Sequence, residues 1–407
     1  MEHSSVHHPE MPHIPSTLTL ASRTPTVGSA RKSETRHILV IYVGGTLGMK
    51  PNSENSLAPV AGYLTTEMRR MRELNPPSDD FAQQGSSSSS NSFSSAALSN
   101  EMRVPTFDVI EYAQLLDSSD MDQQDWLVIA RDIERYYYLY DGFLIAHGTD
   151  TMHYTATALS FLLHNLAKPV ILTGAMVPLM EPYNDARRNL VVGMMFAAST
   201  EICEVCIFCN DVLLRGNRSV KVRHTLSAFS SPNYPALSVM EAQPFRPRRH
   251  LLARPPTGPL AIHSDMSGRV MTVLCHPDFD AESVKTMIQG TSKEAESRLD
   301  CVVLELMGVG NTTSTMARTL QSVVNTASRV GCLVAITTQD LYGSLTAASV
   351  SRLKKSCPDA IFVGDMTTEA AAVKAMYLFG KKLTAAEVKE WMPRNIRGEV
   401  TTVASRL

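Results

Sequence analysis

The chain has 407 residues, 44% hydrophobic and 19% charged, as expected for a globular protein large enough for two domains. Its formal net charge is −2, so nothing in the composition calls for nucleic acid or an acidic membrane surface as a partner. There is no apolar run of membrane-spanning length and no apolar core of a secretory signal at the N-terminus, so we expect no membrane partner.

Two low-complexity stretches stand out in the first hundred residues. Residues 1–36 are rich in Ser, Thr, Pro and His, which predicts a disordered arm. Residues 77–100 contain the run GSSSSSNSFSSAALSN, which predicts a disordered insert. Between them, the β-branched run ILVIY (38–42) predicts a strand that ends in VGGT, and residues 64–76 are expected to be helical.

From residue 107 onward, predicted strands and helices alternate. FDVIEYAQLL predicts a strand, followed by a helix that is capped at Asp120 or Met121 and runs through Trp126 towards Tyr140. Further strands are predicted at 143–146, 170–172 and 203–210, and further helices at 152–166 and 184–200. This alternation predicts a mainly parallel sheet covered on both faces.

The spacing of three cysteines could suggest a metal site. Three of the seven, Cys203, Cys206 and Cys209, are spaced by three in ICEVCIFCN. The segment is typical of a buried strand, on which a period of three distributes the thiols over both faces. No second pair of Cys or His lies nearby, so we predict structural cysteines, with no metal and no cofactor. The unpatterned thiols fit a reducing compartment.

A change of composition marks the middle of the chain. Residues 241–260 hold five prolines and four arginines and are interpreted as an interdomain linker. Residues 37–240 form the predicted larger domain and 261–407 a smaller one, with strands at 270–274, 301–306, 333–337 and 360–363 and a helix capped by Thr367 or Thr368. The predicted fold class is therefore α/β, with two α/β domains joined by a Pro-rich linker.

Two predicted strands of the larger domain end in similar turns. DGFLIAHGTDTM (141–152) places Gly148, Thr149 and Asp150 after one strand, and VGGT places Thr46 after another. The carboxyl ends of parallel strands meet at the sheet edge where open α/β folds bind ligands, so we expect the turns to share a site. For either turn alone, an ordinary threonine cap is the simpler interpretation.

VGGTLGM and HGTDTM together resemble the two threonine signatures of the bacterial-type L-asparaginases, and LLDSSDM (115–121) resembles their cytosolic, type I branch. The resemblance runs in order from residue 37 to the C-terminus, interrupted by the serine-rich insert. It implies hydrolysis of the side-chain amide of L-asparagine through a threonine acyl-enzyme, in the cytoplasm.

The resemblance assigns catalytic roles to particular residues. Amide hydrolysis needs a nucleophile, a base that activates it and donors for the oxyanion. Thr46 matches the family's nucleophile, Thr149 and Asp150 match its second threonine and aspartate, and Lys221 in NDVLLRGNRSVK matches its lysine. Lys168 is the rival lysine, but it precedes a strand and so belongs to the opposite edge of the sheet.

Further positions would bind the substrate. The resemblance implies that Asp150 takes the α-ammonium and that the turn Asp117–Ser118–Ser119 holds the α-carboxylate, mainly through its two serines. A helix cap is an alternative role for this turn and is compatible with substrate binding. Amides near Gly45 and Ala175 are the oxyanion-hole candidates. Asn311 matches a residue that reaches into a neighbouring subunit, which implies a homo-oligomer, either a dimer or a tetramer.

Three positions depart from the family pattern. Val43 replaces the usual first threonine of TGGT, and its side chain is expected to point away from the site. Leu57 stands where many members have a lid tyrosine, so either Tyr63 or Tyr342 assists Thr46 in its place or the step has no tyrosine. Val220 stands where the allosterically regulated bacterial enzyme has threonine, which leaves regulation by asparagine open.

Other functions are compatible with parts of the same sequence. They are a glutaminase-asparaginase of broader specificity, an amidotransferase subunit, a non-catalytic amino-acid-binding relative and a nucleotide-binding module. The chain has no GxGxxG pattern or P-loop at the VGGT turn, which disfavours the last. The basic loop with Arg215 and Arg218, taken alone, is expected to be solvated.

Overall fold

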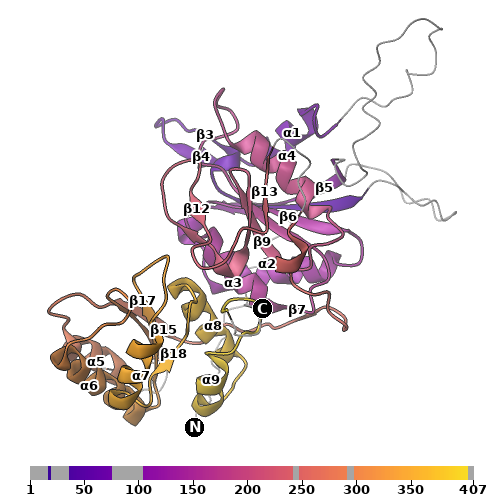
Figure 1. Ribbon diagram of the computed structural model, residues 1–407. Coiled ribbons are helices and arrows are strands. Elements are labelled where there is room, and N and C mark those ends of the chain that lie inside the picture. Colours follow the sequence, from indigo (N-terminus) through magenta and orange to yellow (C-terminus); the bar gives the residue numbers. More distant parts are fainter. Residues whose placement is uncertain (1–16, 20–35, 76–103, 242–246, 291–297, 402–407) are drawn as a thin grey trace, which may run out of the picture.

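The computed structural model describes residues 17–19, 36–75, 104–241, 247–290 and 298–401. Figure 1 shows a larger N-terminal domain and a smaller C-terminal domain, each built from a sheet and its covering helices. The predicted α/β class with two mainly parallel sheets is confirmed. The serine-rich insert and most of the N-terminal arm lie outside the described residues.

The larger domain is organised around an eight-stranded sheet in the order β1-β5-β2-β6-β8-β9-β10-β13. Its five central strands are parallel, and antiparallel pairs close both edges. In sheet order the strands are β1 (Thr17–Thr19), β5 (Thr106–Leu116), β2 (His37–Gly44), β6 (Gly142–Ala146), β8 (Val170–Thr173), β9 (Val205–Cys209), β10 (Val212–Arg215) and β13 (Ser238–Val239). Because Thr17–Thr19 pairs with β5, the prediction of disorder throughout residues 1–36 is wrong for this segment.

Alternating side chains of the sheet enter two different cores, as expected for strands buried on both faces. On β2, Leu39 and Ile41 pack with α2 (Gln123–Tyr136) and α3 (Met152–Leu162). Val40 packs on the other face, which is covered by α1 (Tyr63–Arg70) and α4 (Ala186–Ala197). Cys206 and Cys209 fall into opposite cores, which confirms that the thiol spacing scatters across the strand.

The smaller domain has a four-stranded parallel sheet, β15 (Val270–Leu274), β16 (Cys301–Leu306), β17 (Leu333–Thr338) and β18 (Ile361–Phe362). One face packs on α5 (Ala281–Gln289), α6 (Ser314–Val330) and α7 (Ala347–Ser356). The other packs on α8 (Thr368–Gly380) and α9 (Ala385–Trp391). The predicted cap of α8 is confirmed, since the Thr367 hydroxyl accepts a hydrogen bond from the Ala370 amide.

The two domains share a core at their boundary. Helices α3 and α8 lie side by side there (Figure 1), and Phe161 stacks on Tyr377 with ring centroids 5.3 Å apart. A short strand β7 (Leu163–His164) pairs with β14 (Ala261–Ile262). The chain therefore still hydrogen-bonds to the larger domain at residue 262, beyond the predicted start of the smaller one. Within the predicted linker, Leu251 and Leu252 already pack against the larger domain's core.

Several helix ends differ from their predicted positions for local reasons. The N-cap of α2 is Asp122, which forms a capping box with Asp125, because the preceding residues Ser118–Asp120 form a short 3-10 helix. Helix α2 ends at Tyr136 rather than near Tyr140. α3 ends four residues earlier than predicted because the next residues extend to form β7, and α1 ends at Arg70 rather than 76.

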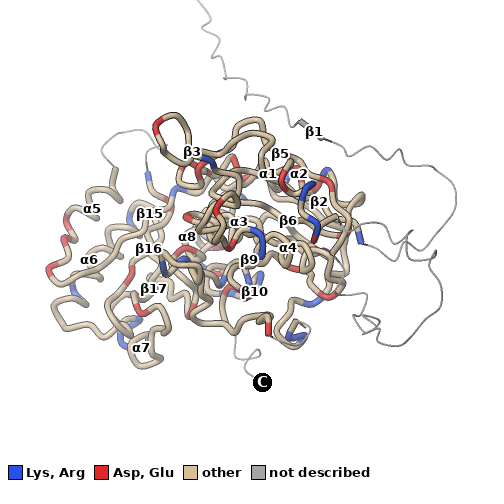
Figure 2. Tube along the Cα trace, turned by 90° about the horizontal axis from the view of Figure 1, so that it is seen from above, with Lys and Arg blue, Asp and Glu red and all other residues tan. Residues whose placement is uncertain are grey.

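Charge is spread over the whole molecule. Acidic and basic residues are interspersed along the trace in Figure 2.

None of the helices in the described part of the chain has the length and apolar character needed to cross a membrane.

Candidate active site

Four strand-ending turns of the larger sheet pack against one another at its carboxyl edge. A Cβ on Gly45 would lie 2.3 Å from the Gly148 Cα, and one on Gly148 would lie 2.7 Å from the Ser118 Oγ. A Cβ on Gly174, after β8, would lie 2.5 Å from the His147 carbonyl oxygen. Only glycines permit this approach, so the turns after β2, β5, β6 and β8 form one compact group.

Thr46 opens this group as the first residue of a 3-10 helix, Thr46–Gly48. Its side chain is partly buried, whereas Leu47 and Gly48 beneath it are buried. Gly45 precedes it with φ +86°, a conformation that favours glycine. The Gly45 amide donates to the Leu116 carbonyl at 3.2 Å, so this one of the amides near Gly45 already has a partner.

Lys221 meets both residues assigned to the second threonine signature. It lies on β11 (Val220–Lys221), and its Nζ is 2.8 Å from the Thr149 Oγ1 and 2.5 Å from the Asp150 Oδ1. The Lys221 side chain is 13% exposed and the Asp150 side chain 59% exposed. Lys168 instead donates to the carbonyls of Tyr137 and Tyr140, away from these turns.

Ser118 connects the DSS turn to the HGTDT turn. Its Oγ accepts from the Asp150 amide at 3.2 Å, and its carbonyl accepts from the Thr151 hydroxyl at 2.7 Å. Asp117 caps the Ser119 amide at 2.9 Å, so the cap role considered for this turn is present. Ser118 is buried and Ser119 exposed, so the two serines predicted to bind substrate differ in their access to it.

Hydrogen bonds from the start of α4 hold the turn after β8 in place. The buried Asp185 carboxylate accepts the amides of Met176 and Val177, at 3.0 to 3.1 Å. The Asn189 amide group donates to the Gly174 carbonyl at 2.9 Å. Ala175, the second oxyanion candidate, lies between these anchors and is held at the edge of the sheet.

His147 was quoted in the sequence motif but assigned no role. It is fully buried, with Nδ1 2.6 Å from the Gly148 carbonyl oxygen and Nε2 2.9 Å from the Thr155 Oγ1. A carbonyl only accepts, so Nδ1 carries the proton and Nε2 accepts from Thr155. Burial lowers the pKa of His147 to about 4, so the ring is neutral at pH 7 and ties the turn to α3.

A second histidine places the smaller domain close to the site. His153, in the first turn of α3, has its Nε2 3.8 Å from a carboxylate oxygen of Glu369 on α8. Burial, followed by the charge of Lys221, lowers the pKa of His153 to about 4, and burial raises the pKa of Glu369. This pair joins residues that are 216 positions apart in the chain, a relation that no local pattern indicates.

Comparisons with known proteins match both domains. The family model described as "Asparaginase, N-terminal" matches residues 37–251, and "Glutaminase/Asparaginase C-terminal domain" matches 269–392. The chain belongs to the asparaginase family. L-asparaginase 1 of Escherichia coli K12 is 36% identical over 90% of this chain and 98% of its own length. The L-asparaginase of Dirofilaria immitis is 34% identical over 90% of this chain, which spans only 61% of that relative.

A solved structure agrees with these matches. L-asparaginase I from Vibrio cholerae has a TM-score of 0.74 and 34% identity, over 90% of this chain and all of that one. The name of this neighbour, L-asparaginase I, matches the type I branch that the LLDSSDM motif predicted. That motif therefore pointed to the correct branch of the asparaginase family.

Three positions bear on whether a tyrosine assists Thr46 in this asparaginase-family protein. Leu57 is 47% exposed on β4 (Leu57–Pro59), which pairs with β3 (Met49–Pro51) in a hairpin beyond Thr46. Tyr63 lies next to this hairpin, with the Lys50 Nζ 3.8 Å above its ring. The Tyr342 hydroxyl, from the smaller domain, lies 3.2 Å from the Ser230 Oγ on the strand paired with β11.

The other two departures concern the surroundings of the site. The Val43 side chain is buried in the core that contains α2 and α3, as predicted. Val220 is also buried, directly before Lys221.

Asn311 is exposed in the smaller domain, where its Oδ1 accepts from the Ser349 hydroxyl at 3.2 Å.

Proposed function

We propose that this protein is an L-asparaginase that hydrolyses the side-chain amide of L-asparagine to L-aspartate and ammonia. One observation carries the proposal: Lys221 bridges Thr149 and Asp150 on a turn that packs against the turn bearing Thr46. A hydroxyl, an amine and a carboxylate in sequence can move a proton, as in the triads of other hydrolases. Binding alone does not require this arrangement.

The proposed reaction is a double displacement on Thr46. Its hydroxyl oxygen attacks the amide carbon, and the proton passes through the Thr149 hydroxyl and Lys221 to the leaving nitrogen, which departs as ammonia. A β-aspartyl ester then remains on Thr46. Water attacks this ester, returns a proton through the same relay and releases aspartate with the threonine regenerated. No metal or cofactor takes part in this scheme.

The proposal also assigns the substrate's charged groups. The exposed side of the Asp150 carboxylate binds the α-ammonium. Lys221 is more buried and leaves that side of the carboxylate open. Ser119 offers the α-carboxylate a hydroxyl, next to the Asp117 cap. The Ala175 amide becomes the preferred oxyanion donor, because the Gly45 amide already bonds to Leu116 and the amides of Met176 and Val177 bond to Asp185.

The test is ammonia release from L-asparagine and L-glutamine, measured on wild type, Thr46→Ala and the matched control Thr46→Ser. We expect activity on asparagine that vanishes in Thr46→Ala and persists partly in Thr46→Ser, which keeps a hydroxyl. One methylene changes selectivity by about 10–200-fold, so comparable rates on glutamine would support a glutaminase-asparaginase instead. An inactive but folded wild type would support the amino-acid-binding alternative.

A cytoplasmic homo-oligomer, dimer or tetramer, is part of the same proposal, with Asn311 completing a neighbour's site. The test is to mix unfolded Thr46→Ala and Asn311→Ala chains, refold them together and measure the activity of the mixture. A mixed pair contains one site with both residues intact, so activity should exceed that of either variant alone. Activity no higher than the mean of the two separate variants would show that Asn311 does not act across an interface.

A further inference from the structure

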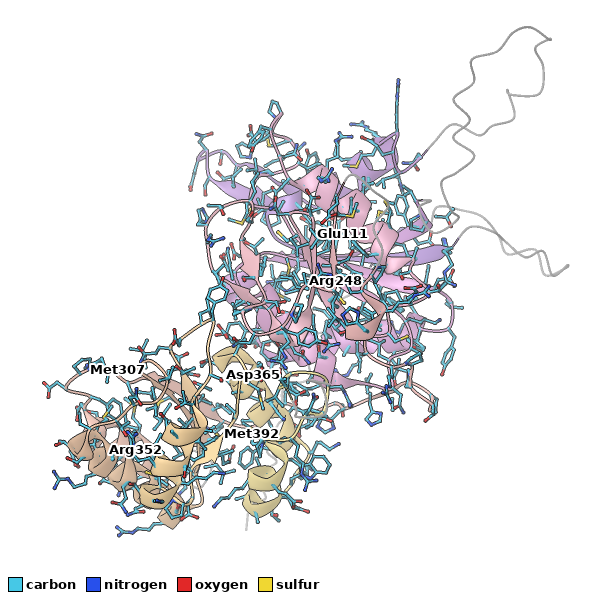
Figure 3. The ribbon with its side chains drawn as sticks, viewed as in Figure 1. Glu111, Arg248, Met307, Arg352, Asp365 and Met392 are labelled. Carbon is cyan, nitrogen blue, oxygen red and sulfur yellow. The ribbon has the colours of Figure 1, made fainter. Side chains whose placement is uncertain are left out.

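Arg218, three residues before Lys221, is buried at the domain boundary, so the prediction of a solvated loop is wrong at this residue. Its side chain is 1% exposed. The Nε donates to the Gly398 carbonyl at 2.7 Å, Nη2 to the Thr401 hydroxyl at 3.0 Å, and Nη1 lies 3.1 Å from the Asp365 carboxylate. These partners all belong to the smaller domain. Figure 3 places Asp365 where the two domains meet.

The smaller domain presents these partners on a fixed support. Residues 394–401, here called the C-terminal strap, are held on α8 by the ion pair of Lys374 with Glu399, 2.6 Å apart and 0% exposed at both side chains. The Glu399 carboxylate also accepts the amides of Ile396 and Arg397. The Asp365 carboxylate accepts the Thr401 amide at 2.8 Å, which joins the strap to the residues before α8.

The larger domain holds the residues around Arg218 from the other side. Arg218 ends a 3-10 helix, Gly216–Arg218, that packs on α3 and β9. A Cβ on Gly216 would lie 2.9 Å from the Ala156 Cβ, so the helix sits directly on α3. The Ser219 hydroxyl donates to the Arg215 carbonyl at 2.7 Å, and β11 with Lys221 begins at the next residue.

We infer that Arg218 and Asp365 are positioning residues for Lys221. Their ion pair lets the smaller domain fix the start of β11, which holds the lysine Nζ against Thr149 and Asp150. Hydrogen bonds tolerate only a few tenths of an ångström, and a misplacement of about 1 Å can cost about 10²-fold in rate. The catalytic consequence rests on the proposed function, whereas the positioning of Lys221 does not.

The charges at this contact fit the inference. Burial acts to raise the pKa of Asp365, but the Arg218 guanidinium and the hydrogen bonds from Thr401 outweigh it and hold the pKa below its usual value. The carboxylate is therefore ionised at pH 7, opposite a guanidinium whose hydrogen bonds reach across the domain boundary. An isosteric Asp365→Asn change removes this charge with little change in volume.

The first test measures kcat and KM for asparagine in Asp365→Asn. We expect kcat to fall by about 10–100-fold, with a much smaller change in KM. The matched control is Arg397→Met, which removes a different strap contact, from the Arg397 Nε to the Ser160 carbonyl at 3.2 Å on α3. It should lower the melting temperature but leave kcat unchanged. Equal losses of kcat in both variants would reduce Arg218 and Asp365 to general domain contacts and overturn the inference.

A double-mutant cycle gives a second readout that a merely structural role would not move. If Asp365 acts through Lys221, the change Asp365→Asn should cost no further activity in a Lys221→Met background. Losses that multiply in the double variant would contradict the inference.

A third measurement does not depend on turnover. Limited acetylation with acetic anhydride, followed by peptide mass spectrometry, reports the accessibility of the Lys221 amine. We expect acetylation of Lys221 to rise several-fold in Asp365→Asn and to stay at the wild-type level in Arg397→Met. If wild type does not hydrolyse asparagine but this rise is seen, the proposed function fails while the positioning stands. Unchanged acetylation in Asp365→Asn would overturn the positioning itself.

Discussion

Two of the protein's lysine–carboxylate pairs have the same chemistry in opposite surroundings. Lys221 and Asp150 are 2.5 Å apart at the edge of the larger sheet, with side-chain exposures of 13% and 59%. Lys374 and Glu399 are 2.6 Å apart at the domain boundary, and neither side chain is exposed. The charges and distances are nearly equal, so any difference in role must come from the neighbours of each pair.

Those neighbours leave one pair open and close the other. Lys221 also contacts the Thr149 hydroxyl, and Asp150 keeps a solvent-facing side that can receive a ligand. The Lys374–Glu399 pair is surrounded by backbone partners, with the Arg394 carbonyl on the amine and amides of the strap on the carboxylate. We therefore assign chemistry to the first pair and the joining of strap and helix to the second.

The largest expected effect breaks the open pair. Lys221→Met should lower kcat for asparagine by roughly 10²–10⁴-fold, the usual range for loss of an acid–base group. Its thermal stability should change little, because Asp150 remains largely in water. Ammonia release and a melting curve on the same sample check this. A kcat within tenfold of wild type would remove Lys221 from the mechanism.

Breaking the closed pair should give the reverse result. Lys374→Met should cost about 3–5 kcal/mol of unfolding free energy, because it leaves the Glu399 carboxylate buried without its counter-charge. Activity per folded molecule should fall much less than in Lys221→Met. The comparison needs an exposed control, and Lys389→Met serves, since Lys389 and Asp359 pair at 39% and 53% exposure and should contribute at most about 1 kcal/mol. Urea unfolding measures all three, and equal costs for Lys374 and Lys389 would contradict this account.

A smaller effect concerns pH. His147 has a pKa lowered to about 4 by burial, whereas the unfolded chain has the ordinary value near 6.5. The unfolded state therefore binds the proton first, so stability is complete above about pH 6.5 and decreases as the pH falls towards 4, by on the order of 3 kcal/mol for this histidine. Urea unfolding between pH 7 and 4.5 should show a shallower loss in His147→Gln. An identical slope in the variant would mean that His147 does not remain neutral in the folded state.

The sheet-edge residues could be predicted because their determinants are local. Thr46, Thr149 and Asp150 each follow a strand whose apolar run is visible in the sequence, and parallel pairing brings such strand ends together. The family resemblance pointed to Lys221, and Lys168 was set aside because it precedes a strand; the two lysines do lie at opposite edges of the sheet. The strands of the smaller domain were placed within a residue or two for the same reason.

The boundary residues could not be predicted because their partners are remote in sequence. Arg218 looks like a solvated arginine until Asp365, 147 residues away, and the strap are folded against it. The two-residue strands β7 and β14 have no pattern of their own and exist only as a pair. His147 lay inside a recognised motif, but only burial and its two hydrogen bonds reveal that it holds the turn together.

The most direct test of the account is to locate the covalent intermediate. Wild type turning over L-asparagine is quenched in acid and digested for peptide mass spectrometry. We predict an aspartyl ester on Thr46 that is absent in Thr46→Ala. An ester on Thr149, or turnover by wild type with no ester on any threonine, would contradict the assignment of Thr46 as nucleophile.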